Sequence, residues 1–192
     1  MSGQQPGEFA VFNRLVVLDA DCRVLLVRVA EAGVWVTPGY YQAGAEPTRE
    51  CLRELAQSYG LEISAPELRG TFWLQRELPR DSSVSLRKVF GARLVSGRDS
   101  PASSGDSASP GALRSIGVDL PEGIDSLAWL SPTEAVAQLS FPHIGVMLER
   151  VATSPDTLWG GSLAQRQGGA AVVEPYYPLA ALRSEAISQR CD

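Results

Sequence analysis

Two glutamates, Glu50 and Glu54, stand four residues apart in a segment whose apolar residues recur at helical spacing. Residues four apart on a helix share one face, so the two carboxylates can point the same way from adjacent turns. Carboxylate oxygens are the ligands that Mg²⁺ and Mn²⁺ prefer. The spacing therefore permits a divalent-metal site. The alternative is a solvated helix face, on which Glu50 pairs with Arg49 or Arg53.

The helix that carries these glutamates has clear signals at both ends. Pro47 suits the first helical position, where its missing N–H costs nothing. Gly60 suits the left-handed position that ends many helices. Apolar residues between them recur at helical spacing, and we expect this face to pack on the core: Cys51, Leu52, Leu55, Ala56 and Tyr59.

Residues 35–61, WVTPGYYQAGAEPTRECLRELAQSYGL, place an extended segment and a glycine-containing loop before this helix. The segment resembles the Nudix box, whose pattern is G-x5-E-x7-R-E-U-x-E-E-x-G-U, with U an aliphatic residue. The positions that match the pattern are Gly39, Arg53, Glu54, Leu55, Gly60 and Leu61. The positions at which the family has glutamate and this chain does not are Ala45, Gln57 and Ser58.

The resemblance implies a MutT-like Nudix hydrolase fold of the α/β (α+β) class, a mixed β-sheet sandwiched between helices. It also implies a substrate in which a nucleoside diphosphate is linked to another moiety, and Mg²⁺ or Mn²⁺ as cofactor. In the family, glutamates at the positions of Glu54, Gln57 and Ser58 hold the metal. Gln57 and Ser58 bring no negative charge, so we expect ordinary metal-dependent hydrolysis to be weakened or lost.

Two other interpretations remain open. The first is an active, divergent phosphoanhydride hydrolase, with Glu54 as the catalytic residue and Glu54 and Glu50 as ligands of Mg²⁺ or Mn²⁺. The second is a non-catalytic module that needs no cofactor and binds a nucleotide or a partner protein through the cleft that holds the substrate in the family. No Ser-His or Cys-His constellation supports metal-independent chemistry.

Four residues are predicted to bind the ligand: Arg28, Gly39, Tyr40 and Arg53. Arg28 precedes the WVTPG segment, where the resemblance places one wall of the cleft, and its guanidinium fork suits phosphate oxygens. Tyr40 offers a ring on which a base can stack. Tyr40 and Tyr41 stand directly after Gly39, where the family usually has glycine, so their rings can instead fill the space of a metal–diphosphate complex.

Other residues with suitable chemistry are given structural roles. Glu46 stands one residue after Ala45, where the family has glutamate, and is expected to brace Arg53. Trp35 and Trp73 are expected in the core. His143, the only histidine, is expected on the surface at a helix start. The remaining arginines in or near predicted strands are assigned to surface charge and edge salt bridges: Arg76, Arg80, Arg87 and Arg93.

The composition bounds the class of protein. With 192 residues and 44% hydrophobic content, the chain can bury one core. Its net charge of −5 argues against a general nucleic-acid binder. There is no long apolar run and no N-terminal signal, which predicts a cytoplasmic protein with no membrane contact. Lys88 is the only lysine among 17 basic residues, a bias typical of GC-rich, often bacterial, genomes.

The predicted organisation is a loose leader at 1–10, a Nudix-like domain at 11–152 and a C-terminal extension at 153–192. The extension is expected to pack on the domain or on a partner, a homodimer included, and AVVEPYYPLA within it to form an edge strand. A serine-rich insertion at 96–123 is expected to be flexible. Within the domain, strands and helices are predicted at Phe12–Leu18, Arg23–Val29, Trp35–Thr37, Thr71–Glu77, Ser85–Leu94, Ser126–Leu130, a short helix after Ser131, and Pro142–Ala152.

Overall fold

The computed structural model describes residues 10–78, 81–97, 120–153, 157–166, 171–173 and 177–178. Its helices are α1 (Thr48–Ser58), α2 (Pro132–Gln138) and α3 (Pro142–Thr153). Its strands are β1 (Ala10–Leu18), β2 (Val24–Val29), β3 (Val34–Val36), β4 (Gly39–Tyr41), β5 (Leu61–Ile63), β6 (Glu67–Leu78), β7 (Asp81–Gly97), β8 (Ile124–Leu130), β9 (Trp159–Arg166), β10 (Ala171–Val173) and β11 (Tyr177–Pro178). None of the helices in these ranges is long and apolar enough to cross a membrane.

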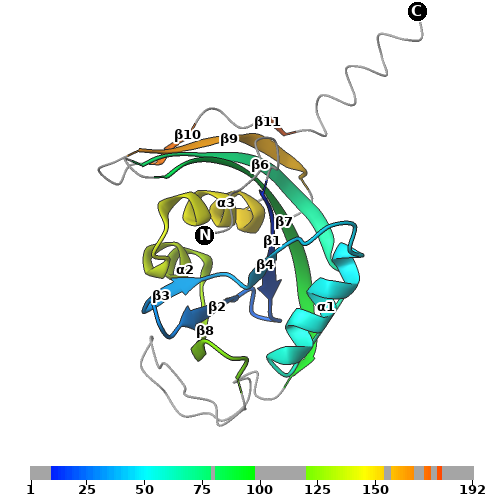
Figure 1. The fold of residues 1–192 in the computed structure, drawn as a ribbon. Coiled ribbons are helices and arrows are strands. Elements are labelled where there is room, and N and C mark those ends of the chain that lie inside the picture. Colours follow the sequence, from blue (N-terminus) through cyan, green and yellow to red (C-terminus); the bar gives the residue numbers. More distant parts are fainter. Residues whose placement is uncertain are drawn as a thin grey trace, which may run out of the picture.

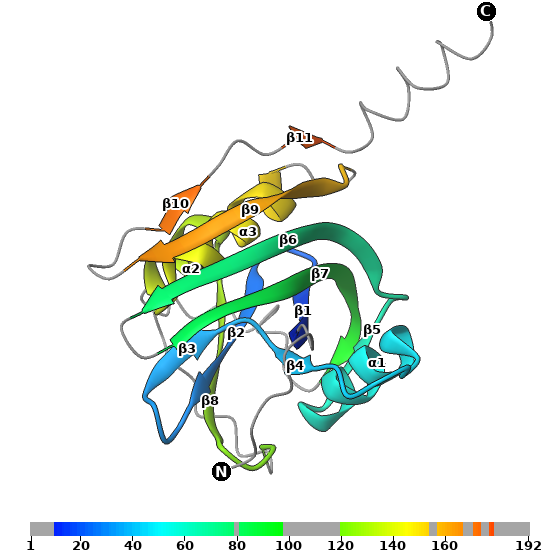
Figure 2. The ribbon, with the colours of Figure 1, turned by 45° about the horizontal axis from the view of Figure 1, so that its top comes forward.

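The strands form one curved, mixed sheet in the order β10-β9-β6-β7-β1-β2-β3. β1 runs parallel to β7, and β6 runs parallel to β9, whereas the other pairs are antiparallel. β4 pairs with β1, β5 with β7, β8 with β2 and β11 with β9. The long strands β6, β7 and β9 bend around α3, and α1 lies on the other side of the sheet (Figures 1 and 2).

The core has two parts because successive side chains of a strand point to opposite faces of the sheet. On β1, Leu15 and Val17 pack with α1, whose buried residues are Leu52 and Ala56. Val16 packs on the other face with residues of α3 such as Met147. The sheet is therefore sandwiched between helices, which confirms the predicted fold class.

Most predicted elements are present, and β6 and β7 are longer than expected because their mutual pairing extends them beyond their apolar runs. Three details differ. Gly39 begins strand β4 and does not simply turn the chain into a loop. Pro47, predicted as the first helical residue, is instead the N-cap of α1, whose first residue is Thr48. Trp73 is 44% exposed, because it alternates on β6 with the buried Phe72. The prediction for Trp73 was wrong, whereas Trp35 is buried as predicted.

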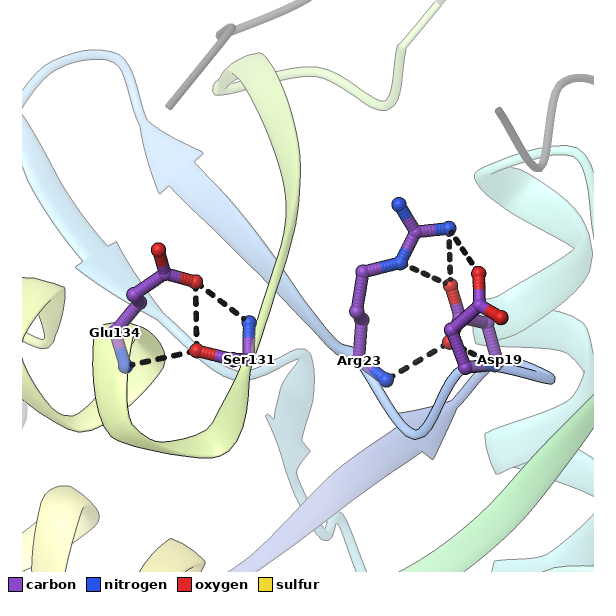
Figure 3. Close-up of polar contacts among 5 residues, drawn as sticks. Asp19, Arg23, Ser131 and Glu134 are labelled. Carbon is purple, nitrogen blue, oxygen red and sulfur yellow. Dashed lines mark hydrogen bonds and ion pairs between the residues drawn. The ribbon is translucent and has the colours of Figure 1, made fainter. Parts of the chain in front are cut away.

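Local signals explain the ends of α1 and α2. Gly60 follows α1 with φ +73°, and its N–H donates to the Gln57 carbonyl, which confirms the predicted helix end. At α2, Ser131 and Glu134 form a capping box, in which each side chain bonds the other residue's backbone N–H (Figure 3).

The β1–β2 hairpin is closed by one buried carboxylate. Asp19 accepts hydrogen bonds from the backbone N–H groups of Asp21 and Arg23 and from the Arg23 side chain (Figure 3). Asp19 is 2% exposed, and both oxygens of its carboxylate accept hydrogen bonds within the turn. Asp19 is therefore a structural acid, unavailable to a ligand.

Two predicted regions lie mostly outside the described residues. These are residues 98–119 of the predicted insertion and residues 1–9 of the predicted leader. The described part of the extension pairs with the sheet: β9 lies beside β6, and β10 and β11 both pair with β9.

Candidate functional site

The outer face of α1 carries the polar residues of the box. Glu50, Arg53, Glu54, Gln57 and Ser58 are all exposed on this face. The Ser58 hydroxyl donates a 2.7 Å hydrogen bond to the carbonyl of Leu55, so its proton is used within the helix. Glu50 and Glu54 are the carboxylates of this helix, one turn apart, as the sequence predicts.

The carboxylates of α1 that could hold a divalent cation are Glu50 and Glu54. In the described ranges, no group of three or more His, Cys, Asp or Glu side chains lies together in a way that could hold a metal ion. Two exposed carboxylates provide part of a coordination sphere that needs six oxygens. The Glu50–Glu54 metal site therefore stays a prediction, and no chemical step is derived through it.

Gly39 allows β4 to approach β1 closely. It pairs with Arg14 in the register of the two strands. A Cβ atom at position 39 would lie 2.5 Å from Cε1 of Phe12 and 2.6 Å from the carbonyl oxygen of Asn13. No side chain fits at these distances, so the matching glycine of the box has a packing role in this chain.

The two tyrosines after Gly39 point to opposite faces of the sheet, as neighbours on a strand must. Tyr40 packs on the α1 side of the core near Cys51. Burial, and then the neighbouring Cys51, raise the pKa of Tyr40 to about 12, so the phenol is neutral at ordinary pH. Tyr41 lies on the α3 side against Phe12, with ring centroids 4.7 Å apart and the rings nearly perpendicular.

Two further predicted residues have partners of their own. Glu46 accepts a hydrogen bond from the Ala43 N–H at 2.8 Å and contacts the Cys51 thiol at 3.8 Å. Within the described ranges no contact joins Glu46 to Arg53, so the bracing prediction was wrong: the carboxylate closes its own loop. Arg28 forms a half-exposed ion pair with Asp125 at 3.1 Å.

A second group of polar residues gathers on the α3 side of the sheet, and we call it the basic cluster: Arg14 of β1, Arg87 of β7 and His143 of α3, with the rings of Phe12 and Tyr41. Arg14, Arg87 and His143 are 6%, 4% and 3% exposed. The guanidinium carbons of Arg14 and Arg87 lie 4.7 and 4.9 Å from the centroid of the Phe12 ring. The parallel pairing of β1 with β7, which sets Phe12 opposite Arg87, brings these residues together.

The hydrogen bonds of the cluster are few for its charge. Nη1 of Arg14 donates to the carbonyl and the hydroxyl of Thr37, both at 3.1 Å. Nε of Arg87 donates to the Ser85 hydroxyl at 3.1 Å. Among the residues that the structure describes, Nε of Arg14 and Nδ1 of His143 are buried without a hydrogen-bond partner.

Positive charge dominates the electrostatics of the basic cluster. Burial, and then the charge of Arg87, lower the pKa of Arg14 to about 9, so this guanidinium remains charged at neutral pH. Burial also lowers the pKa of Arg87. The charge interaction and the side-chain hydrogen bond with Tyr41 partly offset that shift. Burial lowers the pKa of His143 to about 3, helped by the charges of Arg14, Arg87 and Arg76. The imidazole is therefore neutral at physiological pH.

The sequence misses this cluster. It assigns His143 to the surface and Arg87 to surface charge, and both predictions were wrong: the two side chains are buried between β7 and α3. It does not single out Arg14. The sequence carries one signal for it. Arg14 stands two residues from both Phe12 and Val16, so it shares their inward face of the strand, which is an unusual place for a charge.

Comparison with known proteins finds similarity among solved structures. No protein-family model and no curated protein matches the chain. A solved MutT protein from Bacillus halodurans superimposes with a TM-score of 0.62 at 20% identity, covering 88% of this chain and 99% of that one. A NUDIX hydrolase from Nitrosomonas europaea gives 0.56 at 18% identity, covering 77% and 90%. The chain has a Nudix fold.

A third solved structure, a UDP-X diphosphatase, superimposes with a TM-score of 0.51 at 16% identity, covering 84% of this chain and 70% of that one. The resemblance of the box is thus joined by a resemblance of the whole fold. In this Nudix fold, α1 holds the box residues on one side of the sheet, and the basic cluster lies on the other.

Proposed function

We propose that this Nudix-fold protein binds a ligand that contains a diphosphate, in the class of nucleoside diphosphates linked to another moiety. We further propose that ordinary metal-dependent hydrolysis of such ligands is weak or lost. The observation that carries this proposal is the polar face of α1, where Gln57 and Ser58 are exposed in place of carboxylates. Support for the ligand class comes from the fold and from structural neighbours whose names state MutT or diphosphatase activity.

The loss of negative charge on α1 lowers its affinity for a divalent cation. A dication is held by the sum of the charges and oxygens around it, and neutral amide and hydroxyl oxygens add no charge. In this chain Ser58 also uses its hydroxyl proton within the helix. Glu54 and Glu50 remain as carboxylates, so we expect weak, millimolar-range association with Mg²⁺ or Mn²⁺, of the order of the weaker protein sites for hard dications.

The test is turnover on a panel of nucleoside diphosphate-linked substrates with Mg²⁺ and with Mn²⁺. The proteins compared are the wild type, Glu54→Gln, and a double variant, Gln57→Glu with Ser58→Glu, which restores the carboxylates. We expect little difference between the wild type and Glu54→Gln, and tighter Mn²⁺ binding by the double variant. Metal-dependent turnover by the wild type that Glu54→Gln abolishes would overturn the proposal.

A divergent hydrolase is the second candidate, supported by the placement of Glu50 and Glu54 on the same exposed face of α1. In that case Glu50→Gln reduces turnover as Glu54→Gln does. A control at Glu62, an exposed acid of β5 outside the box helix, leaves turnover unchanged. A non-catalytic module that binds a partner protein is the third candidate, and it predicts neither turnover nor nucleotide binding.

A further inference from the structure

The basic cluster buries more positive charge than its protein partners balance. Arg14 and Arg87 are both more than nine-tenths buried, and both face the same ring of Phe12. Removing a charge from water is costly unless an opposite charge or several hydrogen bonds replace the solvent. In the described part of the chain, no carboxylate forms an ion pair with Arg14, Arg87 or His143.

The aromatic rings only partly compensate this charge. The face of Phe12 attracts both guanidinium groups, and Tyr41 adds a second ring 5.6 Å from Arg87. A ring quadrupole is a weaker partner than an anion in contact with the same group. The rings therefore stabilise the two guanidinium groups only in part, and an anion would be a stronger partner for their charge.

An oxyanion would satisfy Nε of Arg14, and also Nδ1 of His143 in the tautomer that carries the proton on Nδ1. Guanidinium groups present several N–H donors in a plane, which suits the oxygens of a phosphate. Nε of Arg14 and Nδ1 of His143 are buried and unpartnered. His143 is also the second residue of α3, so the positive end of that helix dipole lies at the same place.

Tyr41, whose ring contacts Phe12, is 58% exposed, whereas Arg14, Arg87 and His143 are buried behind these rings, so an anion would have to reach them past Tyr41. The cluster lies on the α3 side of the sheet, whereas the box acids lie on α1 across the sheet. An anion bound here would meet arginines directly. A divalent cation is not required to bring it to the protein.

We propose that Arg14, Arg87 and His143 form a binding site for a phosphate group, which the protein holds without a metal ion. For the class of ligand this inference rests on the proposed function. The site itself stands on the buried charges and the unpartnered donors, and it does not depend on whether hydrolysis occurs.

The experiment measures binding of inorganic pyrophosphate to the full chain by titration calorimetry with EDTA present. The chain contains a single histidine, so the imidazole NMR signal of His143 reports on the site without ambiguity. Because ADP carries the same phosphate chemistry, a second arm with ADP distinguishes a nucleotide ligand from a free phosphate compound. The variants are Arg87→Met, Arg87→Lys, Glu54→Gln and, as the matched control, Arg93→Met, an exposed arginine of the same strand.

We expect pyrophosphate to bind the wild type without metal and to move the His143 signal. Arg87→Met should weaken binding by roughly 10- to 100-fold, the range for hydrogen bonds to charged groups. Arg87→Lys should recover part of it, since the charge returns without the planar fork. Arg93→Met and Glu54→Gln should bind as the wild type does.

The inference is overturned if saturating pyrophosphate and ADP leave the His143 signal in place, or if Arg87→Met binds as tightly as Arg93→Met. Metal-dependent turnover abolished in Glu54→Gln would overturn the proposed function alone, because the binding experiment contains EDTA. Pyrophosphate binding lost in both Glu54→Gln and Arg87→Met would place the anion at α1 and refute the basic cluster as its site. The two proposals can thus fail separately.

Discussion

Acid should destabilise this protein through His143, and the structure gives the size of the effect. The ordinary pKa of histidine is near 6.5, and burial together with Arg14, Arg87 and Arg76 lowers that of His143 to about 3. Between these values the unfolded chain binds a proton at this site and the folded chain does not. Stability from this group is therefore fully present above pH 6.5 and is lost as the pH falls toward 3.

Each pH unit in this window costs about 1.4 kcal/mol of the free energy of unfolding. At pH 4.5 the loss is therefore roughly 2–3 kcal/mol relative to pH 7. The assay is urea denaturation of the wild type and of His143→Gln at both pH values. Subtracting the two removes the contribution of carboxylates that titrate in the same range, because both proteins contain them.

Two results would refute this reasoning. One is an NMR titration in which the single imidazole protonates near pH 6.5 in the folded protein. The other is an equal loss of stability on acidification in the wild type and in His143→Gln. A direct check of the cause is Arg87→Met, in which one of the neighbouring charges is absent and the pKa of His143 should rise.

Three other predictions concern packing and local structure. Arg87→Met should raise the free energy of unfolding of the ligand-free protein by roughly 1–3 kcal/mol, because an unpaired buried charge is replaced by an apolar chain; thermal denaturation in phosphate-free buffer measures this, and a lower melting temperature than Arg93→Met contradicts it. Gly39→Ala should cost about 1–3 kcal/mol, because the added methyl overlaps Phe12; equal stability in urea would show that β4 has room to move. Ser131→Ala should cost about 1 kcal/mol through loss of the α2 cap, which Ser131→Asp should largely restore in the same assay.

The sequence predicts α1 and its surroundings well because their signals are local. The spacing of apolar residues, the glycine at position 60 and the box pattern all lie within residues 35–61, and each acts over one or two turns of chain. The same holds for the serine cap of α2. The Nudix fold follows from the box pattern together with the order of the strands and helices around it.

The roles of single polar residues were less predictable, since a role depends on what packs against the residue. Glu46 bonds within its own loop, Arg28 pairs with Asp125 from a strand far along the chain, and Trp73 faces outward on β6. Asp125 stands 97 positions after Arg28, so spacing along the chain carries no information about that pair. The exposure of Trp73 follows from its alternation with Phe72, but the sequence does not say which face of β6 meets the core.

The sequence by itself determined the resemblance to the Nudix box and the absence of carboxylates at Gln57 and Ser58, because the identity and spacing of residues on one helix are fixed by the chain. Only the tertiary structure decided that Arg14, Arg87 and His143 meet. They come from β1, β7 and α3, and the parallel pairing of β1 with β7 and the packing of α3 inside the curved sheet bring them together. Burial then strengthens the electrostatic interactions of these residues, because such interactions grow as water is excluded. No single segment of the sequence reveals that burial.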